Sequence, residues 1–117
     1  MPKKIKVDIT RTAEADVAEI CEYIAQDKPE AAIAFVMRLE EQIGTLESCP
    51  ERCPLVPENE LLGTAYRHLL HGNYRTVFKI VGSRVIIMRV LHGSRLLDTE
   101  MLGGVSGPIN HFLPKLS

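Results

Sequence analysis

The sequence lacks any long apolar segment. Apolar residues make up 45% of the 117 residues, but no run approaches the roughly 20 residues that a membrane-spanning helix needs. The basic start of the chain, from Met1 to Lys6, leads into no apolar stretch of about 7–15 residues, so we expect no secretory signal. Charged residues at 25% complete an ordinary globular composition, which excludes a disordered chain. We therefore expect a cytoplasmic protein with no membrane partner.

Cysteine is scarce: the chain has Cys21, Cys49 and Cys53. An odd number without a secretory signal indicates reduced thiols in a reducing compartment. A zinc site needs about four ligands, and no second pair at ligand spacing accompanies Cys49 and Cys53. His68 and His71 cannot serve, because residues three apart on a strand point to opposite faces. The sequence predicts neither a metal site nor a cofactor.

A strong net charge is also missing, but the charge is unevenly distributed. The net charge is −1 and the sequence pI is about 6.4. Residues 1–60 carry 7 Lys and Arg against 13 Asp and Glu, whereas residues 61–117 carry 7 against 2 and all four His. One interpretation is an anionic partner for the second half of the chain. The other is that acidic helices and a basic sheet complement each other.

The first half of the sequence has a strand pattern followed by two helical patterns. Apolar and polar residues alternate over residues 3–10, which predicts a strand with one buried face. Thr12 is a suitable N-cap for a helix over about residues 12–26. Pro29 fits the first turn of a second apolar-striped helix, which Cys49-Pro50 ends. The two helices are predicted to form an antiparallel hairpin.

The second half is predicted to be a three-stranded meander. After a proline-rich loop over residues 50–63, three β-rich runs are separated by Gly72-Asn73 and Gly82-Ser83, which suit type II′ turns. The runs are Ala65–His71, Tyr74–Val81 and Arg84–His92. The fold class is therefore α+β, with an antiparallel sheet in the order β-α-α-β-β-β and the helical hairpin on one face. We expect a single domain over residues 1–102 and a flexible tail over residues 103–117.

The two turns define a register and hence two faces of the sheet. They pair residue 71 with 74, 68 with 77, 81 with 84, 77 with 88 and 75 with 90. The face expected to join Phe35 and Leu39 of the second helix in the core carries Phe78, Ile80, Val85, Ile87 and Leu91. The other face carries His68, Arg75, Lys79, Arg84, Met88, Val90 and His92. No helix is predicted to cover this mixture of cations and apolar groups, which is typical of a partner surface. A one-residue bulge would exchange the two faces.

The strand sequences Tyr74–Val81 and Val85–Arg95 resemble those of the RelE/ParE toxin superfamily, the toxins of bacterial type II toxin–antitoxin (plasmid stabilisation) modules. The helical segments Ala15–Ala25 and Pro29–Val36 fit the helical hairpin of that family, so the resemblance covers roughly residues 3–102. The closing His92-Gly93-Ser94-Arg95 is more similar to the ParE branch. The resemblance implies a toxin that arrests growth and is neutralised by a cognate antitoxin.

The two branches imply different activities. ParE-like toxins inhibit DNA gyrase by binding it, whereas RelE-like toxins are metal-independent ribonucleases that cut mRNA on the ribosome. A ribonuclease needs proton transfer and cations beside the phosphate. Under that alternative the resemblance places Arg67, Arg75 and Arg95 at basic positions of the active surface. His92 or His68 is the candidate for proton transfer, because His titrates near neutral pH.

Several departures count against the ribonuclease. No Tyr follows Arg95 within residues 96–102, and Leu69 stands where RelE-like toxins carry a second basic residue. The pI is also low for a ribosome-binding protein. We therefore expect a ParE-like gyrase inhibitor, with an mRNA endonuclease and a non-toxic RelE-like domain as alternatives. The expected partner-binding residues are Arg75, Lys79, Arg84, Met88 and Val90.

Overall fold

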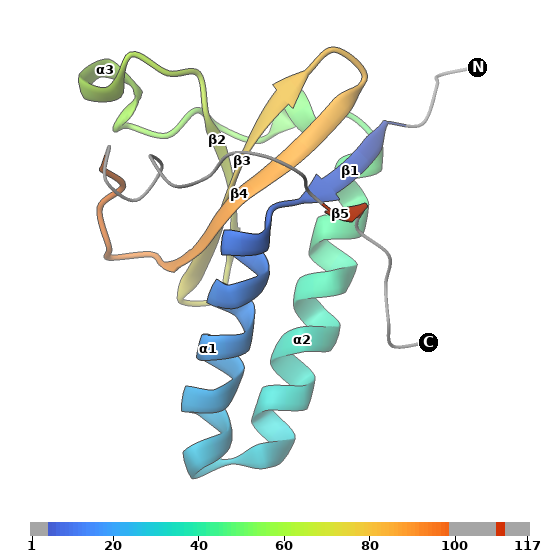
Figure 1. Ribbon diagram of the computed structural model, residues 1–117, viewed down its shortest axis with the longest axis vertical. Helices are drawn as coiled ribbons and strands as arrows, with labels where there is room; N and C mark the ends of the chain where they lie inside the picture. Colours follow the sequence, from blue (N-terminus) through green and yellow to red (C-terminus); the bar gives the residue numbers. More distant parts are fainter. Residues whose placement is uncertain (1–4, 99–109, 112–117) are drawn as a thin grey trace.

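A computed structural model describes residues 5–98 and 110–111. Two helices follow the first strand, and a meander of three strands follows a loop with short helical turns (Figure 1). The elements are β1 (Lys6–Ile9), α1 (Arg11–Asp27), α2 (Pro29–Gly44), the 3-10 turns η1 (Thr45–Glu47) and η2 (Pro50–Arg52), α3 (Asn59–Leu62), β2 (Arg67–His71), β3 (Tyr74–Val81), β4 (Arg84–His92) and β5 (Asn110–His111). Within the described residues no helix is both long and apolar enough to cross a membrane. Apart from β5, the predicted tail over residues 103–117 lies outside the described residues.

The strands form one sheet in the order β2-β3-β4-β1-β5. The α+β class and the order of the elements are confirmed, but the sheet is mixed because β1 runs parallel to β4. The chain reverses direction four times between these two strands: once in the helical hairpin, once before β2 and once at each β-turn. An even number of reversals leaves β4 pointing the same way as β1.

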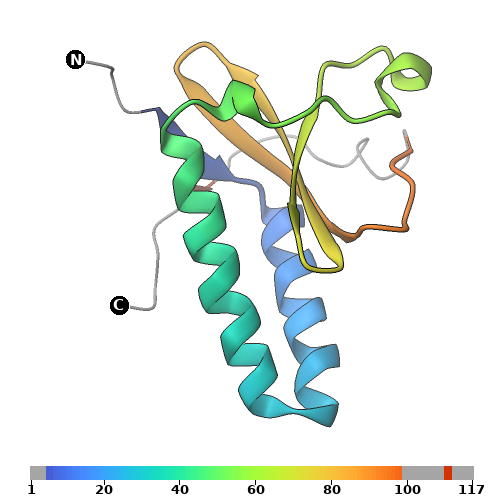
Figure 2. The same ribbon diagram turned by 180° about the vertical axis from the view of Figure 1, so that it is seen from behind.

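The helical hairpin packs on one face of the sheet, and its joined ends extend beyond the sheet in both views (Figures 1 and 2). Thr10, not the predicted Thr12, is the N-cap of α1. Its hydroxyl accepts a hydrogen bond from the Ala13 amide at 3.1 Å and donates one to the Met88 carbonyl at 3.1 Å. The cap therefore also ties the start of α1 to the middle of β4. Pro29 begins α2 as predicted.

The core between the helices and the sheet contains the residues predicted for it on α2 and β3. Phe35 and Leu39 pack with Phe78 and Ile87, and Ile80 packs against the same cluster. Gly72 and Gly82 have φ of 59° and 60°, and Cys49 is the one non-glycine residue of the described chain with positive φ. Positive φ at the first turn position alone is typical of the predicted type II′ hairpins.

A β-bulge in β4 changes the register halfway along the β3–β4 hairpin. Phe78 lies opposite Ile87, but Val77 lies opposite Arg89, so Met88 is the extra residue. The predicted pairs 77–88 and 75–90 are therefore wrong, while 71–74, 68–77 and 81–84 are confirmed. Beyond the bulge the faces exchange. Val90 joins the helix-facing core, and Leu91 lies in a separate cluster on the other face.

That other face is partly covered, contrary to expectation. A second cluster brings together the loop after η2, strands β3 and β4 and the segment after β4: it consists of Val56, Val77, Leu91 and Leu97, with Leu62 and Tyr66 packed against it. Asn59 holds the covering loop in shape, since its side-chain amide donates to the Tyr66 carbonyl and accepts from the Tyr66 amide, both at 2.9 Å. The loop and the segment after β4 thus cover a face that no helix was predicted to cover.

Candidate functional site

Arg75 lies at the centre of this covered face and is bound by the protein itself. Its side chain is 4% exposed and forms a two-pronged ion pair with the buried Glu58. The same guanidinium donates to the Arg95 carbonyl at 2.8 Å and lies 3.3 Å from Nδ1 of His68. Arg75 was predicted as a phosphate or partner contact, but its hydrogen bonds are directed into the chain.

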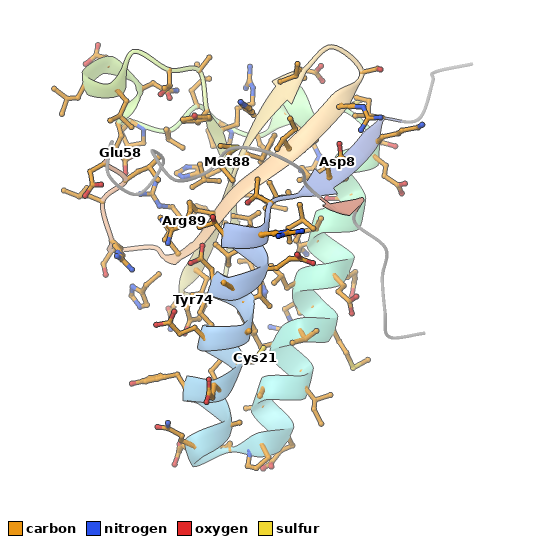
Figure 3. All side chains as sticks on the ribbon, viewed as in Figure 1. Asp8, Cys21, Glu58, Tyr74, Met88 and Arg89 are labelled. Carbon is orange, nitrogen blue, oxygen red and sulfur yellow. The ribbon has the colours of Figure 1, made fainter. Side chains whose placement is uncertain are left out.

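Glu58 completes this buried site from the loop (Figure 3). Its carboxylate also accepts a hydrogen bond from the Leu97 amide at 2.9 Å. The bonds from Arg75 and from Leu97 lower the pKa of Glu58 from 4.5 to about 2. The ion pair therefore fastens the loop and the segment after β4 to the middle of the sheet. Glu58 was missed because nothing in an acidic, proline-rich loop indicates which basic residue it will meet.

Arg67 is likewise used within the fold. Its guanidinium donates to the backbone carbonyls of Glu51 at 3.1 Å and Cys53 at 2.6 Å. These bonds hold the η2 turn against β2, beside the buried Cys53 thiol. Burial raises the pKa of that thiol. Of the four predicted catalytic residues, Arg67 and Arg75 thus form contacts that hold loops against the sheet.

His92 and Arg95 lie together at the end of β4. Both line an open groove of about 420 Å³ between β4 and α1. His92 Nδ1 lies 2.7 Å from the Ser94 hydroxyl and accepts from the Ser94 amide at 3.2 Å. The imidazole also meets the Tyr74 ring edge-on, with 5.6 Å between centroids. The remaining lining residues are Asp16, Glu19, Ile20, Tyr23, Tyr74, Val90 and Leu91.

The α1 wall of this groove is acidic. Asp16 binds Arg89 through two hydrogen bonds, at 2.7 Å to Nε and 2.8 Å to Nη2, and accepts a third from the Val90 amide at 3.0 Å. The ion pair raises the pKa of Arg89 and joins the beginning of α1 to β4 just after the bulge. Figure 3 labels Arg89 beside the start of α1. The sequence gives no signal that pairs Asp16 with Arg89, because the two residues lie 73 positions apart. Glu19 lines the same wall.

The expected partner-binding residues do not share one open surface. Met88 and Val90 are buried, at 4% and 1% exposed, so with Arg75 three of the five lie inside the fold. The bulge explains the burial of Val90, because it turns this residue to the helix side of the sheet. Arg84 is exposed and pairs with the buried Asp8 at 2.6 Å, and Lys79 is half-buried.

No cluster of three or more His, Cys, Asp or Glu that could hold a metal ion occurs among the described residues. Cys49 and Cys53 are the pair whose spacing suggests metal ligands, but their two thiols lie in different environments. Cys49 is exposed and Cys53 is buried.

Solved structures similar to this chain include chains of two toxin–antitoxin systems. A chain of the chromosomal ParDE system from P. aeruginosa superposes with a TM-score of 0.62 at 24% identity, covering 76% of this chain and 96% of that one. A chain of the RelBE2 toxin–antitoxin complex from Mycobacterium tuberculosis gives a TM-score of 0.51 at 26% identity, covering 76% and 98%. The fold is thus that of the toxins of type II toxin–antitoxin modules.

The family model described as the ParE toxin of the type II toxin–antitoxin system parDE matches residues 7–97. The chain belongs to this ParE toxin family. None of the curated proteins matches it. The matched region runs from β1 to the segment held by Glu58, and it leaves out β5.

Proposed function

We propose that this toxin acts in the cytoplasm by binding DNA gyrase and breaks no bond itself. The observation that supports binding over RNA cleavage is the internal use of Arg67 and Arg75. Cleavage without a metal needs cations that stabilise a charged phosphorane, together with an acid and a base. With two of the candidate guanidiniums bonded inside the fold, the groove retains Arg95 and His92 from that set.

The charge of the groove supports the same conclusion. Glu19 stands on the wall opposite His92 and Arg95, beside Asp16, whose charge Arg89 balances. The Glu19 carboxylate repels a phosphate backbone, whereas a protein surface with charges of both signs can match such a groove. The membership in the ParE family points in the same direction.

We further propose that a short, acidic, partly disordered antitoxin neutralises the toxin. The basic second half of the chain carries a charge complementary to such a partner. The described surface adds the exposed apolar side chain of Val81, which lies opposite Arg84 and two positions from Lys79 on β3. A segment that orders on binding gains both apolar area and charge complementarity there.

The ribonuclease alternative rests on His92 and Arg95 sharing one groove, and a single substitution separates it from gyrase binding. Expression of the wild-type chain in a bacterial host should arrest growth, and coexpression of the antitoxin should restore it. His92→Ala should leave cellular mRNA as intact as the wild type does, because a binding toxin cuts no RNA. His92→Gln, which keeps a polar side chain in the groove, should leave the arrest in place, because a binding toxin needs no proton transfer. The measurements are the growth curve and mRNA integrity.

A general acid or base would behave differently. If His92 transferred protons, His92→Ala would reduce cleavage by about 10²–10⁴-fold and relieve the arrest. The conservative His92→Gln variant and a thermal melt control for folding. A wild-type chain that leaves growth unchanged would favour the non-toxic alternative.

A further inference from the structure

Strand β1 has the burial of an internal strand but would be an edge strand without β5. Val7, Asp8 and Ile9 are all buried, although their side chains alternate between the two faces of the sheet. On one side β1 pairs with β4, and on the other it pairs with β5, where Asp8 lies opposite His111 and Ile9 opposite Asn110 (Figure 1). This second pairing lies outside the family match, which ends at residue 97.

The backbone of β1 directs an alternate set of amides away from β4. The Lys6 amide donates to Ser83 at 3.2 Å and the Thr10 amide donates to Ile87 at 3.1 Å, both on the β4 side. The Ile5 amide points the other way and donates to the Glu47 carbonyl at 3.1 Å. By alternation the amides of Val7 and Ile9 also point to the outer edge. Such a row of donors is a template for an added strand.

We propose that the outer edge of β1 is a strand-binding site and that the chain's own Asn110–His111 segment occupies it as a replaceable edge strand. The sequence around it suits this role. Ile109, Phe112 and Leu113 flank the pair, and Pro108 and Pro114 bound the segment.

The pairing is short enough to be exchanged. Among the described residues, two of β5 pair with β1, whereas β3 and β4 pair over eight residue positions. The family match also ends at residue 97, before the segment begins, so the segment is not part of the region that the family shares. An extended segment of another protein can add to β1 only after this segment leaves.

Hydrogen exchange of single amides tests the proposal in the full-length chain. Asn110→Pro combined with His111→Pro removes two amides and blocks pairing. Exchange at Val7 and Ile9 should become at least ~10-fold faster, while the Asp8 amide, which faces β4, should keep its rate. The matched control is Asn110→Ala with His111→Ala, which keeps the backbone donors and should retain the slow exchange at Val7 and Ile9.

A peptide covering residues 107–114 completes the test. Added to the proline variant, it should restore slow exchange at Val7 and Ile9, and the same peptide with both prolines should not. Equal exchange in the wild type and the proline variant would overturn the proposal. Slow exchange that persists in the proline variant together with a dimer by light scattering would also overturn it, because a second copy would then occupy the edge.

Discussion

Replacing Glu58 with alanine is expected to lower the free energy of unfolding by about 3–5 kcal/mol, because it leaves the buried guanidinium of Arg75 without its counter-charge. The loss also releases the Leu97 amide, so the segment after β4 should lose its anchor. Chemical denaturation measures the free energy of unfolding. Glu60→Ala is the matched control: the residue lies two positions away and is exposed, so its replacement should cost under about 0.5 kcal/mol.

A double variant separates the contribution of the ion pair to stability from that of side-chain packing. Glu58→Leu with Arg75→Met replaces both charges by apolar groups of similar volume and should recover much of the stability lost by Glu58→Ala. Equal stability of Glu58→Ala and Glu60→Ala would contradict the assignment of Glu58 as the anchor of this face.

The same carboxylate should make stability depend on pH. The pKa of Glu58 lies at about 2 in the folded chain, below its ordinary value of 4.5. A lowered pKa means that the stabilisation is complete above the ordinary value and is lost as pH falls from about 5 towards 2. The stability advantage of the wild type over Glu58→Gln should shrink across that range.

Replacing Phe78 with alanine is expected to cost about 3–5 kcal/mol, the range for large aromatic side chains in a core. Phe78 is 0% exposed and packs in the cluster that joins α1, α2 and the sheet. Val81 on the same strand is 51% exposed, and Val81→Ala should cost under about 1 kcal/mol. A thermal melt followed by circular dichroism compares the two variants. Similar melting temperatures would remove Phe78 from the core and reverse the assigned faces of β3.

The predictable part of the fold is the part that local chemistry determines. Gly72 and Gly82 fix two tight turns, and the pairing beside each turn follows directly. The bulge at Met88 was not predictable, because a β-bulge depends on how β4 meets its neighbours and leaves no mark on this residue type. From that point the expected faces were reversed, and Val90 and Leu91 were each assigned to the wrong side.

The candidate site was harder to predict because its contacts are distant in sequence. Arg75 and Glu58 are separated by 17 positions and Asp16 and Arg89 by 73. Family resemblance gave the cations their expected roles, but it did not reveal that a loop would bury Arg75. His92 and Arg95 lie three positions apart in the closing turn, and this short separation explains why both line one groove.

The supercoiling activity of gyrase tests the proposed binding of the toxin to this enzyme most directly. Purified chain is added to gyrase with relaxed plasmid and, separately, to a translating ribosome with a defined mRNA. We predict inhibited supercoiling or trapped cleaved DNA, with the mRNA intact. Normal supercoiling together with cut mRNA would contradict the account.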